Sequence, residues 1–201
     1  MVSRRKEELR FDHSVIGDMI ESGAKVLDLG CGDGDLLEYL VINKGVEGSG
    51  VEISEEAIYS CVEKGLSVSH GDIDSGLTEY PDKFFDYVIF YQTMQQVHKP
   101  KEAISEALRI GKKVIIGFPN FCHIKARLQM VFFGHVPVTA SLPYSWYDTP
   151  NLHFLSIKDF QGFCDDQNIF VEKRVFLAKA RRIKIFPNMF ALNAIFQISK
   201  K

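Results

Sequence analysis

The fold of this chain is decided by residues 25–38, which read KVLDLGCGDGDLLE. A short aliphatic run breaks here into three alternate glycines, Gly30, Gly32 and Gly34, and a helical apolar pattern over 36–41 follows directly. A strand, a glycine turn and a helix in this order are typical of a Rossmann-like sheet, in which the backbone comes close to a nucleotide. Glycine lacks the Cβ that would hold a ligand away, and it permits the positive φ of a tight turn.

The spacing of the glycines argues against a dinucleotide. A G-x-G-x-x-G fingerprint would need its third glycine at the position of Asp35, whereas this chain reads G-x-G-x-G. Three carboxylates, those of Asp28, Asp33 and Asp35, surround the turn. They disfavour a pyrophosphate and suit a ligand whose nearby end carries an ammonium and a sulfonium group. A glycine turn that binds no ligand is the alternative interpretation.

This first motif resembles that of class I S-adenosylmethionine-dependent methyltransferases, which reads V-L-D-x-G-C-G-x-G. The resemblance implies that S-adenosylmethionine or S-adenosylhomocysteine is the cofactor. We expect Asp28 to order the amides of the turn and the amino group of the ligand. The residues of the turn expected to contact the cofactor are Asp28, Gly30, Cys31, Gly32 and Gly34.

Two further acids fall at the ends of predicted strands, where ligands bind in open α/β sheets. Glu52 lies 20 residues after Gly32, where a carboxylate can accept both hydroxyls of a ribose. Asp72 follows the next strand and can accept from the exocyclic amine of an adenine, although it can equally cap a turn. Three apolar or aromatic neighbours complete the predicted cofactor set: Ile53, Ile73, which would pack on the adenine, and Tyr91.

The sequence assigns no catalytic residue. The end of the fourth predicted strand lacks the (D/N)-P-P-(Y/F) motif of amide and amine N-methyltransferases, and 118–120 is Phe-Pro-Asn rather than the Pro-Cys of a cytosine-5 enzyme. Tyr91, His98 and His153 are weak candidates, and a surface turn is the favoured interpretation of His98. No Ser-His-Asp order or metal-ligand spacing is present, so no metal site is expected.

Length and composition set broad bounds. The 201 residues, 46% of them hydrophobic, predict a single domain over 1–201 with a substantial core. The net charge of -2 gives no global field that favours nucleic acid or an anionic membrane, and the short basic groups at 4–6 and 181–182 read as solvated surface. Four scattered cysteines indicate reduced thiols in a cytoplasmic protein. Neither a secretory signal nor a membrane span is visible.

The remaining pattern predicts a doubly wound Rossmann-like α/β fold. We expect a seven-stranded sheet, mostly parallel with an antiparallel last strand and with helices on both faces. The expected strands are 26–29, 48–53, 66–70, 86–91, 113–118, 169–178 and 190–199, and the expected helices are 11–20, 54–64, 100–111, 120–133 and 156–167. Ser54 is expected to cap the helix over 54–64 and Asn120 the helix over 120–133, and Ser156 with Asp159 resembles a capping box at the last helix.

An aromatic and proline-rich insertion is expected at about 134–156, between the fifth and sixth strands. It is long for a loop and carries Tyr144, Trp146 and Tyr147. Long loops with their own aromatics tend to be lids or binding surfaces. A cap over the adenosyl pocket, a docking surface for a partner, and an insertion that only packs on the domain all remain open.

Several segments together resemble the MetW family of methionine-biosynthesis proteins. They include YQTMQQ at 91–96, FPNF at 118–121 and LPYSWYDTPNLH at 142–153. The resemblance implies a role in methionine biosynthesis beside homoserine O-acyltransferase. It leaves open whether that partner uses acetyl or succinyl groups, and how many subunits assemble, with a homodimer among the options.

Two functions of different class follow. In the first, the chain binds S-adenosylmethionine or S-adenosylhomocysteine without catalysis and docks on the acyltransferase through 134–153, so that the end product of the pathway reports on its first committed step. In the second, it is an active methyltransferase of a small-molecule acceptor. A nicotinamide-binding protein is a weaker third reading, which Asp35 argues against.

Overall fold

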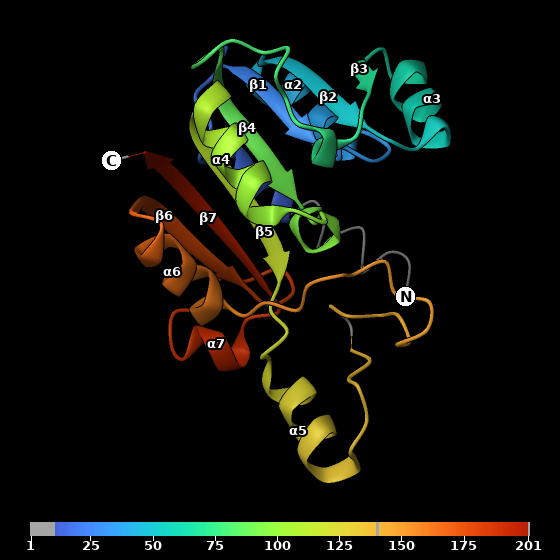
Figure 1. The fold of residues 1–201 in the computed structure, drawn as a ribbon, viewed down its shortest axis with the longest axis vertical. Coiled ribbons are helices and arrows are strands. Elements are labelled where there is room, and N and C mark those ends of the chain that lie inside the picture. The colour runs from blue at the N-terminus through green and yellow to red at the C-terminus, as the bar shows by residue number, and fades with distance from the viewer. Residues whose placement is uncertain (1–10, 140, 201) are drawn as a thin grey trace.

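The fold is a seven-stranded sheet in the order β3-β2-β1-β4-β5-β7-β6. Figure 1 labels all of these strands, from β3 at one edge of the sheet to β6 at the other. The computed structural model describes residues 11–139 and 141–200. All neighbouring strands are parallel except β7, which is antiparallel to both β5 and β6. The predicted fold class is confirmed. The strands are β1 (Lys25–Leu29), β2 (Glu47–Glu52), β3 (Ser67–His70), β4 (Phe85–Tyr91), β5 (Gly111–Pro119), β6 (Ile169–Leu177) and β7 (Asn193–Lys200).

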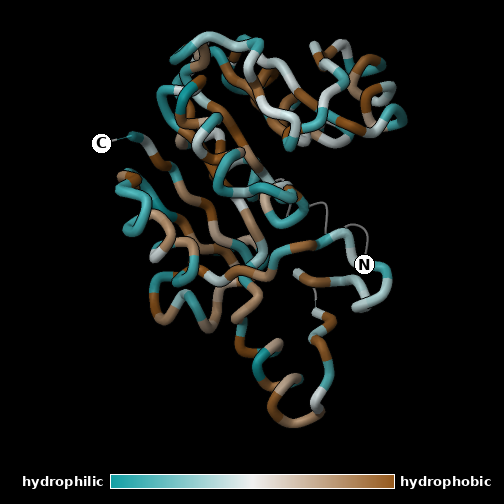
Figure 2. Tube along the Cα trace, viewed as in Figure 1, coloured by the Kyte–Doolittle hydropathy of each residue, from teal (hydrophilic) through white to brown (hydrophobic). Residues whose placement is uncertain are grey.

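Helices cover both faces of the sheet. Residues 11–17 are helical, and the other helices are α2 (Asp35–Lys44), α3 (Glu55–Glu63), α4 (Pro100–Ile110), α5 (Ile124–Phe133), α6 (Ile157–Asp166) and the short α7 (Pro187–Phe190), with 3₁₀ turns η1 (Ile73–Ser75) and η2 (Met94–Gln96). One core packs α4 and α6 on the sheet. The other packs the 11–17 helix and α2 on the opposite face. The apolar colouring of the central strands in Figure 2 follows from this double burial.

The position of the site follows from the strand order. β1 lies between β2 and β4, so the connections from β1 and from β4 leave the sheet in opposite directions. Such a switch point opens a crevice at the carboxyl ends of the two strands. Leu29 and Tyr91 end these strands, and the glycine turn follows directly.

Helix α5 begins later than the sequence predicts. Asn120 was expected to cap it, but the helix starts at Ile124 with His123 as its N-cap, whose side chain accepts from the Lys125 N–H. Asn120 is instead fully buried and joins the end of β5 to the segment before β7. Its Nδ2 donates to the carbonyls of Asn188 (3.2 Å) and Ala191 (2.9 Å). Tertiary hydrogen bonds therefore replace the expected cap.

The start of the last strand also differs from the prediction. Strand β7 begins at Asn193, and Phe190 belongs to α7, a helical turn with Pro187 at its first position. Two predicted N-caps are confirmed. Ser54 accepts from the Ala57 N–H at α3, and Ser156 forms a capping box with Asp159 at α6.

Two segments stand apart from the sheet. Figure 1 shows α5 projecting away from the body of the molecule. The described residues between α5 and α6 form neither helix nor strand.

The basic group at 4–6 lies outside the described residues. Within 11–139 and 141–200, every helix is too short or too polar to cross a lipid bilayer.

We predict that Asn120→Ala lowers the free energy of unfolding by about 2–4 kcal/mol, because it strips hydrogen bonds from buried groups. The two carbonyls lose their amide donor, and the Cys122 N–H loses the Asn120 Oδ1 acceptor. Urea denaturation measures the change. Asn43→Ala is the control, since Asn43 is exposed and donates only to the Tyr39 carbonyl of its own helix. Equal effects of the two variants would contradict the role of Asn120.

Candidate functional site

The glycine turn after β1 has one open position. All three glycines have positive φ, of 71°, 55° and 80° for Gly30, Gly32 and Gly34. A Cβ on Gly30 would lie 2.4 Å from Thr93 Cγ2, and one on Gly34 would lie 2.6 Å from Leu66 Cδ1. A Cβ on Gly32 would meet nothing within 4 Å. Packing thus requires two of the glycines, while Gly32 faces open space.

Glu52, at the end of β2, fixes this turn. Its Oε2 accepts from the Gly32 N–H (2.8 Å), and its Oε1 accepts from the Ile53 and Ser54 N–H groups (2.8 and 3.0 Å). Asp28 was expected to order the amides of the turn. No hydrogen bond joins the two in the described part of the chain, and that expectation is corrected here. Glu52, at the end of the neighbouring strand β2, takes that role instead.

Asp28 is a buried carboxyl group with no hydrogen-bond donor among the described residues. Its side chain is 2% exposed, and burial, reinforced by the nearby charge of Glu52, raises its pKa from 3.8 to about 7. An ionised carboxylate in this environment is unfavourable unless a cation or an N–H donor reaches it. Asp28 therefore favours a positively charged ligand group.

The cavity beside Asp28 is strongly acidic. Four carboxylates line this space of about 390 Å³, and its lining contains neither lysine nor arginine. The Oε1 atom of Gln95 is buried there and has no hydrogen-bond donor in the described ranges. We call this space the acidic cavity; its lining includes Asp12, His13, Asp28, Asp33, Asp35, Tyr91, Gln92, Gln95, Ser141, Pro143, Tyr144, Asn151 and Asn193.

A second cavity of about 520 Å³ lies at the ends of β2 and β3, and we call it the strand-end cavity. It shares five lining residues with the acidic cavity, so the two spaces adjoin. The shared residues are Gly30, Cys31, Tyr91, Gln92 and Gln96, and the strand-end cavity adds Gly32, Glu52, Ile53, Asp72, Ile73 and His98 among others. Of the predicted cofactor residues only Gly34 lines neither space; it is the N-cap of α2.

The strand-end cavity offers an apolar wall and polar edges. Ile53 is 60% exposed, and Ile73 is half-buried against the core. Asp72 is exposed, and its Oδ1 caps η1 by accepting from the Asp74 N–H (2.9 Å). The capping reading of Asp72 is therefore correct, and the same side chain also lines the cavity.

Three residues were candidates for chemistry, and the structure separates them. Tyr91 donates its hydroxyl proton to Asp12 Oδ2 (2.8 Å), and burial, together with the charge of Asp12, raises its pKa well above 10. The phenol therefore stays protonated near neutral pH. His98 is exposed and lines the strand-end cavity, where its backbone N–H donates to Asp74 Oδ2. His153 is exposed and lines neither cavity.

Sequence reasoning missed Asp12 and His13, which come from the helix before β1. Asp12 also accepts from Asn193 Nδ2 (3.1 Å). His13 is 7% exposed, and its ring lies edge-on to Tyr91 with centroids 5.8 Å apart. Burial lowers the His13 pKa, although the charges of Asp35 and Asp33 oppose the shift. The sequence offered one signal for them, because Asp12 and His13 are polar residues within the apolar helical pattern of 11–20.

Gln92 is a strained residue at the end of β4. Its φ of 61° lies in the left-handed region, which side chains other than glycine rarely adopt. The backbone is held there because the Gln92 N–H donates to the Gly117 carbonyl and its own carbonyl accepts from Gln95 Nε2. Strain of this kind is often found at functional sites. Gln92 lines both cavities.

Part of the 134–156 segment forms a wall of the acidic cavity. Ser141, Pro143, Tyr144 and Asn151 line it. The N–H groups of the next two residues, 152 and 153, both donate to the Gln95 carbonyl (2.8 and 3.0 Å). The segment is thus attached to η2, directly beside the site.

All four cysteines are free. Burial raises the pKa of Cys31, Cys61 and Cys164, so these thiols stay protonated. In the described ranges no group of three or more His, Cys, Asp or Glu side chains has an arrangement that could hold a metal ion. Cys61 Sγ lies 3.2 Å from the Gly32 carbonyl and packs beneath the turn.

Comparison with known proteins gives a family match over most of the chain. The model of the family described as "Methionine biosynthesis protein MetW" matches residues 10–198. A relative named "Bifunctional methionine biosynthesis protein MetXA/MetW", from Rhodopirellula baltica, is 33% identical over 177 residues. That match covers 84% of this chain and 28% of the relative.

Two further similarities concern the methyltransferase fold. The "Ubiquinone biosynthesis O-methyltransferase" of Methylococcus capsulatus is 29% identical over 96 residues, which are 45% of this chain and 40% of that one. This chain thus spans well under half the length of either curated relative in these matches. A crystal structure of a SAM-dependent methyltransferase from Archaeoglobus fulgidus superposes with a TM-score of 0.69 at 19% identity, covering 98% and 94% of the two chains.

The raised pKa of Asp28 predicts how Asp28→Asn changes stability with pH. A carboxyl whose pKa is 3.8 when unfolded and about 7 when folded destabilises the folded chain increasingly as the pH rises from about 4 to 7. Asparagine removes this penalty, so its stabilising effect should be roughly 3 kcal/mol larger at pH 8 than at pH 5. Urea denaturation at the two pH values measures the difference.

The control is Asp33→Asn, at an exposed position of the same turn. We expect it to change the unfolding free energy by less than about 0.5 kcal/mol at either pH. A pH-independent effect of Asp28→Asn would show that Asp28 does not carry the buried charge.

Proposed function

Because this chain belongs to the MetW family of methionine biosynthesis proteins, we propose that it binds S-adenosylmethionine or S-adenosylhomocysteine and acts with homoserine O-acyltransferase. One observation carries the first half of the proposal. An acidic cavity adjoins a strand-end cavity across the glycine turn, and each has the chemistry of one end of an adenosyl amino acid.

The strand-end cavity is the proposed site of the adenosine. In this proposal Glu52 accepts from the ribose hydroxyls, although its oxygens already accept three backbone N–H groups and would share their remaining lone pairs. Ile53 and Ile73 supply apolar surface for the two faces of an adenine. Asp72 supplies a carboxylate oxygen for the exocyclic amine.

The acidic cavity is the proposed site of the amino acid end. An ammonium group there would offer its protons to Asp28 and to the buried Gln95 Oε1. The negative potential of the four carboxylates favours the sulfonium of S-adenosylmethionine over the neutral sulfur of S-adenosylhomocysteine. The same potential opposes a dinucleotide, because a pyrophosphate would lie beside Asp33 and Asp35.

A non-catalytic, cofactor-sensing role is the favoured form of this function, because none of the three residues suggested by the sequence is suited to act as a base in the acidic cavity. Tyr91 stays protonated, and His98 and His153 do not line that cavity. An active methyltransferase is the second candidate, and His13 is the observation that favours it. Its lowered pKa keeps the imidazole neutral near pH 7, and it lines the acidic cavity beside Tyr91. Incubation of cell extract with methyl-labelled S-adenosylmethionine tests this alternative, and loss of all label transfer in His13→Gln would support it.

The partner half of the proposal draws on the bifunctional relative, whose name joins MetXA and MetW in one chain, of which the match covers 28%. A large exposed apolar surface in this chain fits such an association. Single exposed apolar side chains are ordinary, but a contiguous group of them marks an interaction site. The large apolar side chains that are exposed on α5 and on the segment after it are Leu128, Met130, Val131, Phe132, Phe133, Val136, Val138, Tyr144, Trp146, Tyr147, Leu152 and Phe154.

The 134–156 segment connects the two halves of the proposal, the binding of the ligand and the binding of the partner. Tyr144 lines the acidic cavity, whereas Trp146 and Tyr147, two and three residues further on, lie outside its lining and are more exposed. A partner that holds these aromatics would bias the position of the cavity wall. By linkage, ligand binding would then change the affinity for the partner by the same factor. The end product of the pathway would in this way act on its first committed step.

We predict that Gly32→Ala weakens S-adenosylhomocysteine binding at least about tenfold, because the new methyl group enters the strand-end cavity. Gly65→Ala is the matched control. Gly65 has a φ of 72° and equally open surroundings, but it lies in the turn after α3 and lines neither cavity. Both variants should lose about 1–2 kcal/mol of stability from the left-handed backbone, and only the first should lose affinity.

Calorimetric titration with S-adenosylhomocysteine, and with NAD for comparison, measures these affinities. Unchanged binding in Gly32→Ala would displace the ligand from this turn. Failure of the unaltered chain to bind S-adenosylmethionine or S-adenosylhomocysteine would reject the cofactor half of the proposal.

For the partner half, we predict that Phe132→Ser and Tyr147→Ser each reduce copurification with homoserine O-acyltransferase at least about tenfold, because each removes exposed aromatic area. Tyr59→Ser is the control, since Tyr59 is 68% exposed on α3, away from this surface. Titration with S-adenosylhomocysteine in the presence of the acyltransferase should show a shifted affinity. An intact complex in both variants would place the interface elsewhere, and no complex with the unaltered chain would reject the partnership.

A further inference from the structure

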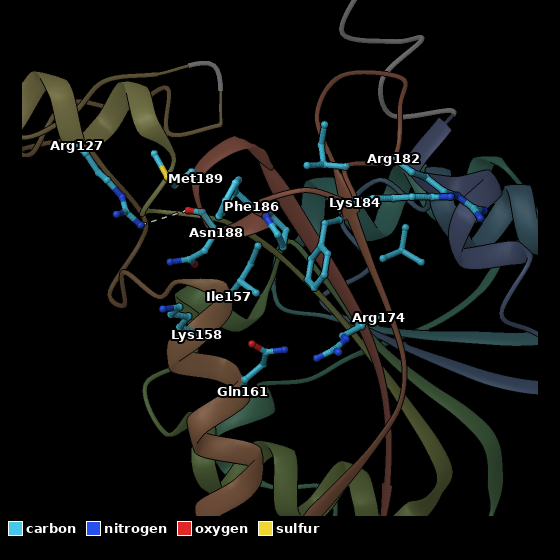
Figure 3. Close-up of a pocket in the computed structure, with 14 residues that line it drawn as sticks. Arg127, Ile157, Lys158, Gln161, Arg174, Arg182, Lys184, Phe186, Asn188 and Met189 are labelled. Atoms are coloured by element: carbon cyan, nitrogen blue, oxygen red, sulfur yellow. Dashed lines mark hydrogen bonds between the residues drawn. The ribbon is translucent and has the colours of Figure 1, made fainter.

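A third cavity lies away from the site described above. It has a volume of about 760 Å³ and shares no lining residue with the acidic or the strand-end cavity. Its walls come from α5, α6, β6 and the connection from β6 to α7. Figure 3 shows side chains from these separate segments around one space.

The lining is basic. It contains five cationic side chains and no carboxylate. Five like charges around one space repel one another, and an anion between them relieves that repulsion. The chain as a whole has a net charge of -2, so this is a local concentration of positive charge. The five residues are Arg127, Lys158, Arg174, Arg182 and Lys184.

Two of these cations already have partners. Arg127 Nε donates to the Cys122 carbonyl (2.6 Å), and Arg182 forms an ion pair with Asp18 (3.2 Å). The side chains of Lys158, Arg174 and Lys184 form no hydrogen bond or ion pair with the described residues, and all three residues are exposed. They come from three different segments, so their convergence is a product of the fold and not of a run of basic residues. Three charged groups are thus free to bind an anion here.

The cavity also has an apolar and aromatic part. Phe176 and Ile157 line it from β6 and α6, and Phe186 stands at the start of α7. Phe186 is 69% exposed and has a left-handed backbone with a φ of 45°. A non-glycine residue rarely adopts this conformation, and backbone strain of this kind is often found at functional sites. A flat ring could pack on such a surface while its charged end meets the cations.

We propose that this cavity binds a small organic phosphate, with two or more negative charges next to a flat apolar group. Guanidinium and ammonium groups bind phosphate oxygens through strong charge-assisted hydrogen bonds, and the planar fork of Arg174 can do so with two bonds. A concave space of this volume is typical of small-molecule sites and unlike a flat protein interface. The assignment does not depend on the proposed function.

Calorimetric titration of the full chain with uridine triphosphate tests the assignment, without divalent cations and with S-adenosylhomocysteine present to keep the other site occupied. The base is a pyrimidine, so the nucleotide does not resemble an adenosyl ligand. We expect saturable binding that weakens as salt rises. Tripolyphosphate should bind several-fold more weakly, because it lacks the flat group, and uridine should not bind measurably.

Arg174→Gln and Lys184→Gln should each weaken uridine triphosphate binding about tenfold, because each removes a charge-assisted contact. Lys173→Gln is the matched control. It makes the same change of charge one residue along β6, at an exposed position outside the cavity lining, and should alter the affinity less than twofold. Thermal unfolding midpoints verify that all three variants fold.

Three results would overturn the proposal. The first is no saturable binding of uridine triphosphate, and the second is binding that is unchanged in Arg174→Gln and Lys184→Gln. The third is binding of an acidic peptide, ten glutamates long, in preference to the nucleotide, which would make this cavity a protein-docking site.

Discussion

The carboxylate of Glu52 holds the candidate site together. It lies at the end of β2 and accepts from the N–H of Gly32 in the turn after β1, so it bonds two strand ends to each other. Its other oxygen accepts from the backbone at 53 and 54, where α3 is about to begin. The position of the turn, the border of the strand-end cavity and the entry to α3 therefore depend on one side chain. Gly32 has a positive φ, and its contact with Glu52 holds the turn in place.

Charge is distributed very unevenly over this nearly neutral chain. The lining of the acidic cavity contains four carboxylates and neither lysine nor arginine, and the lining of the third cavity contains five cations and no carboxylate. One group of each set pairs with a residue outside the lining, Asp35 with Lys64 and Arg182 with Asp18. The net charge of -2 conceals both sets. Arg182, which the sequence suggested was only solvated surface, belongs to the second group together with Lys184 of the same connection. The net charge of the sequence therefore does not predict where the fold brings side chains of like charge together.

The sequence predicted the fold well because the decisive signals are local. Glycine spacing, the nearly unbroken apolar run of β4 and the Ser156–Asp159 capping box are read within a few residues. Glu52 and Asp72 were found because parallel strands bring their carboxyl ends to one edge. Asp12, His13 and Gln92 were missed because their roles depend on tertiary packing and backbone strain. Asn120 was misread for the same reason: its side chain bonds to residues about 70 positions away.

The burial of Asp28 has a consequence for the lifetime of the protein. A charge enclosed in the fold without a partner lowers the stability of the unliganded chain, and a cationic ligand that pairs with it restores that stability. Unfolded molecules are the ones that cellular proteases remove. Turnover of this chain would then be fastest when its ligand is scarce, so the abundance of the protein would follow the supply of the molecule it binds.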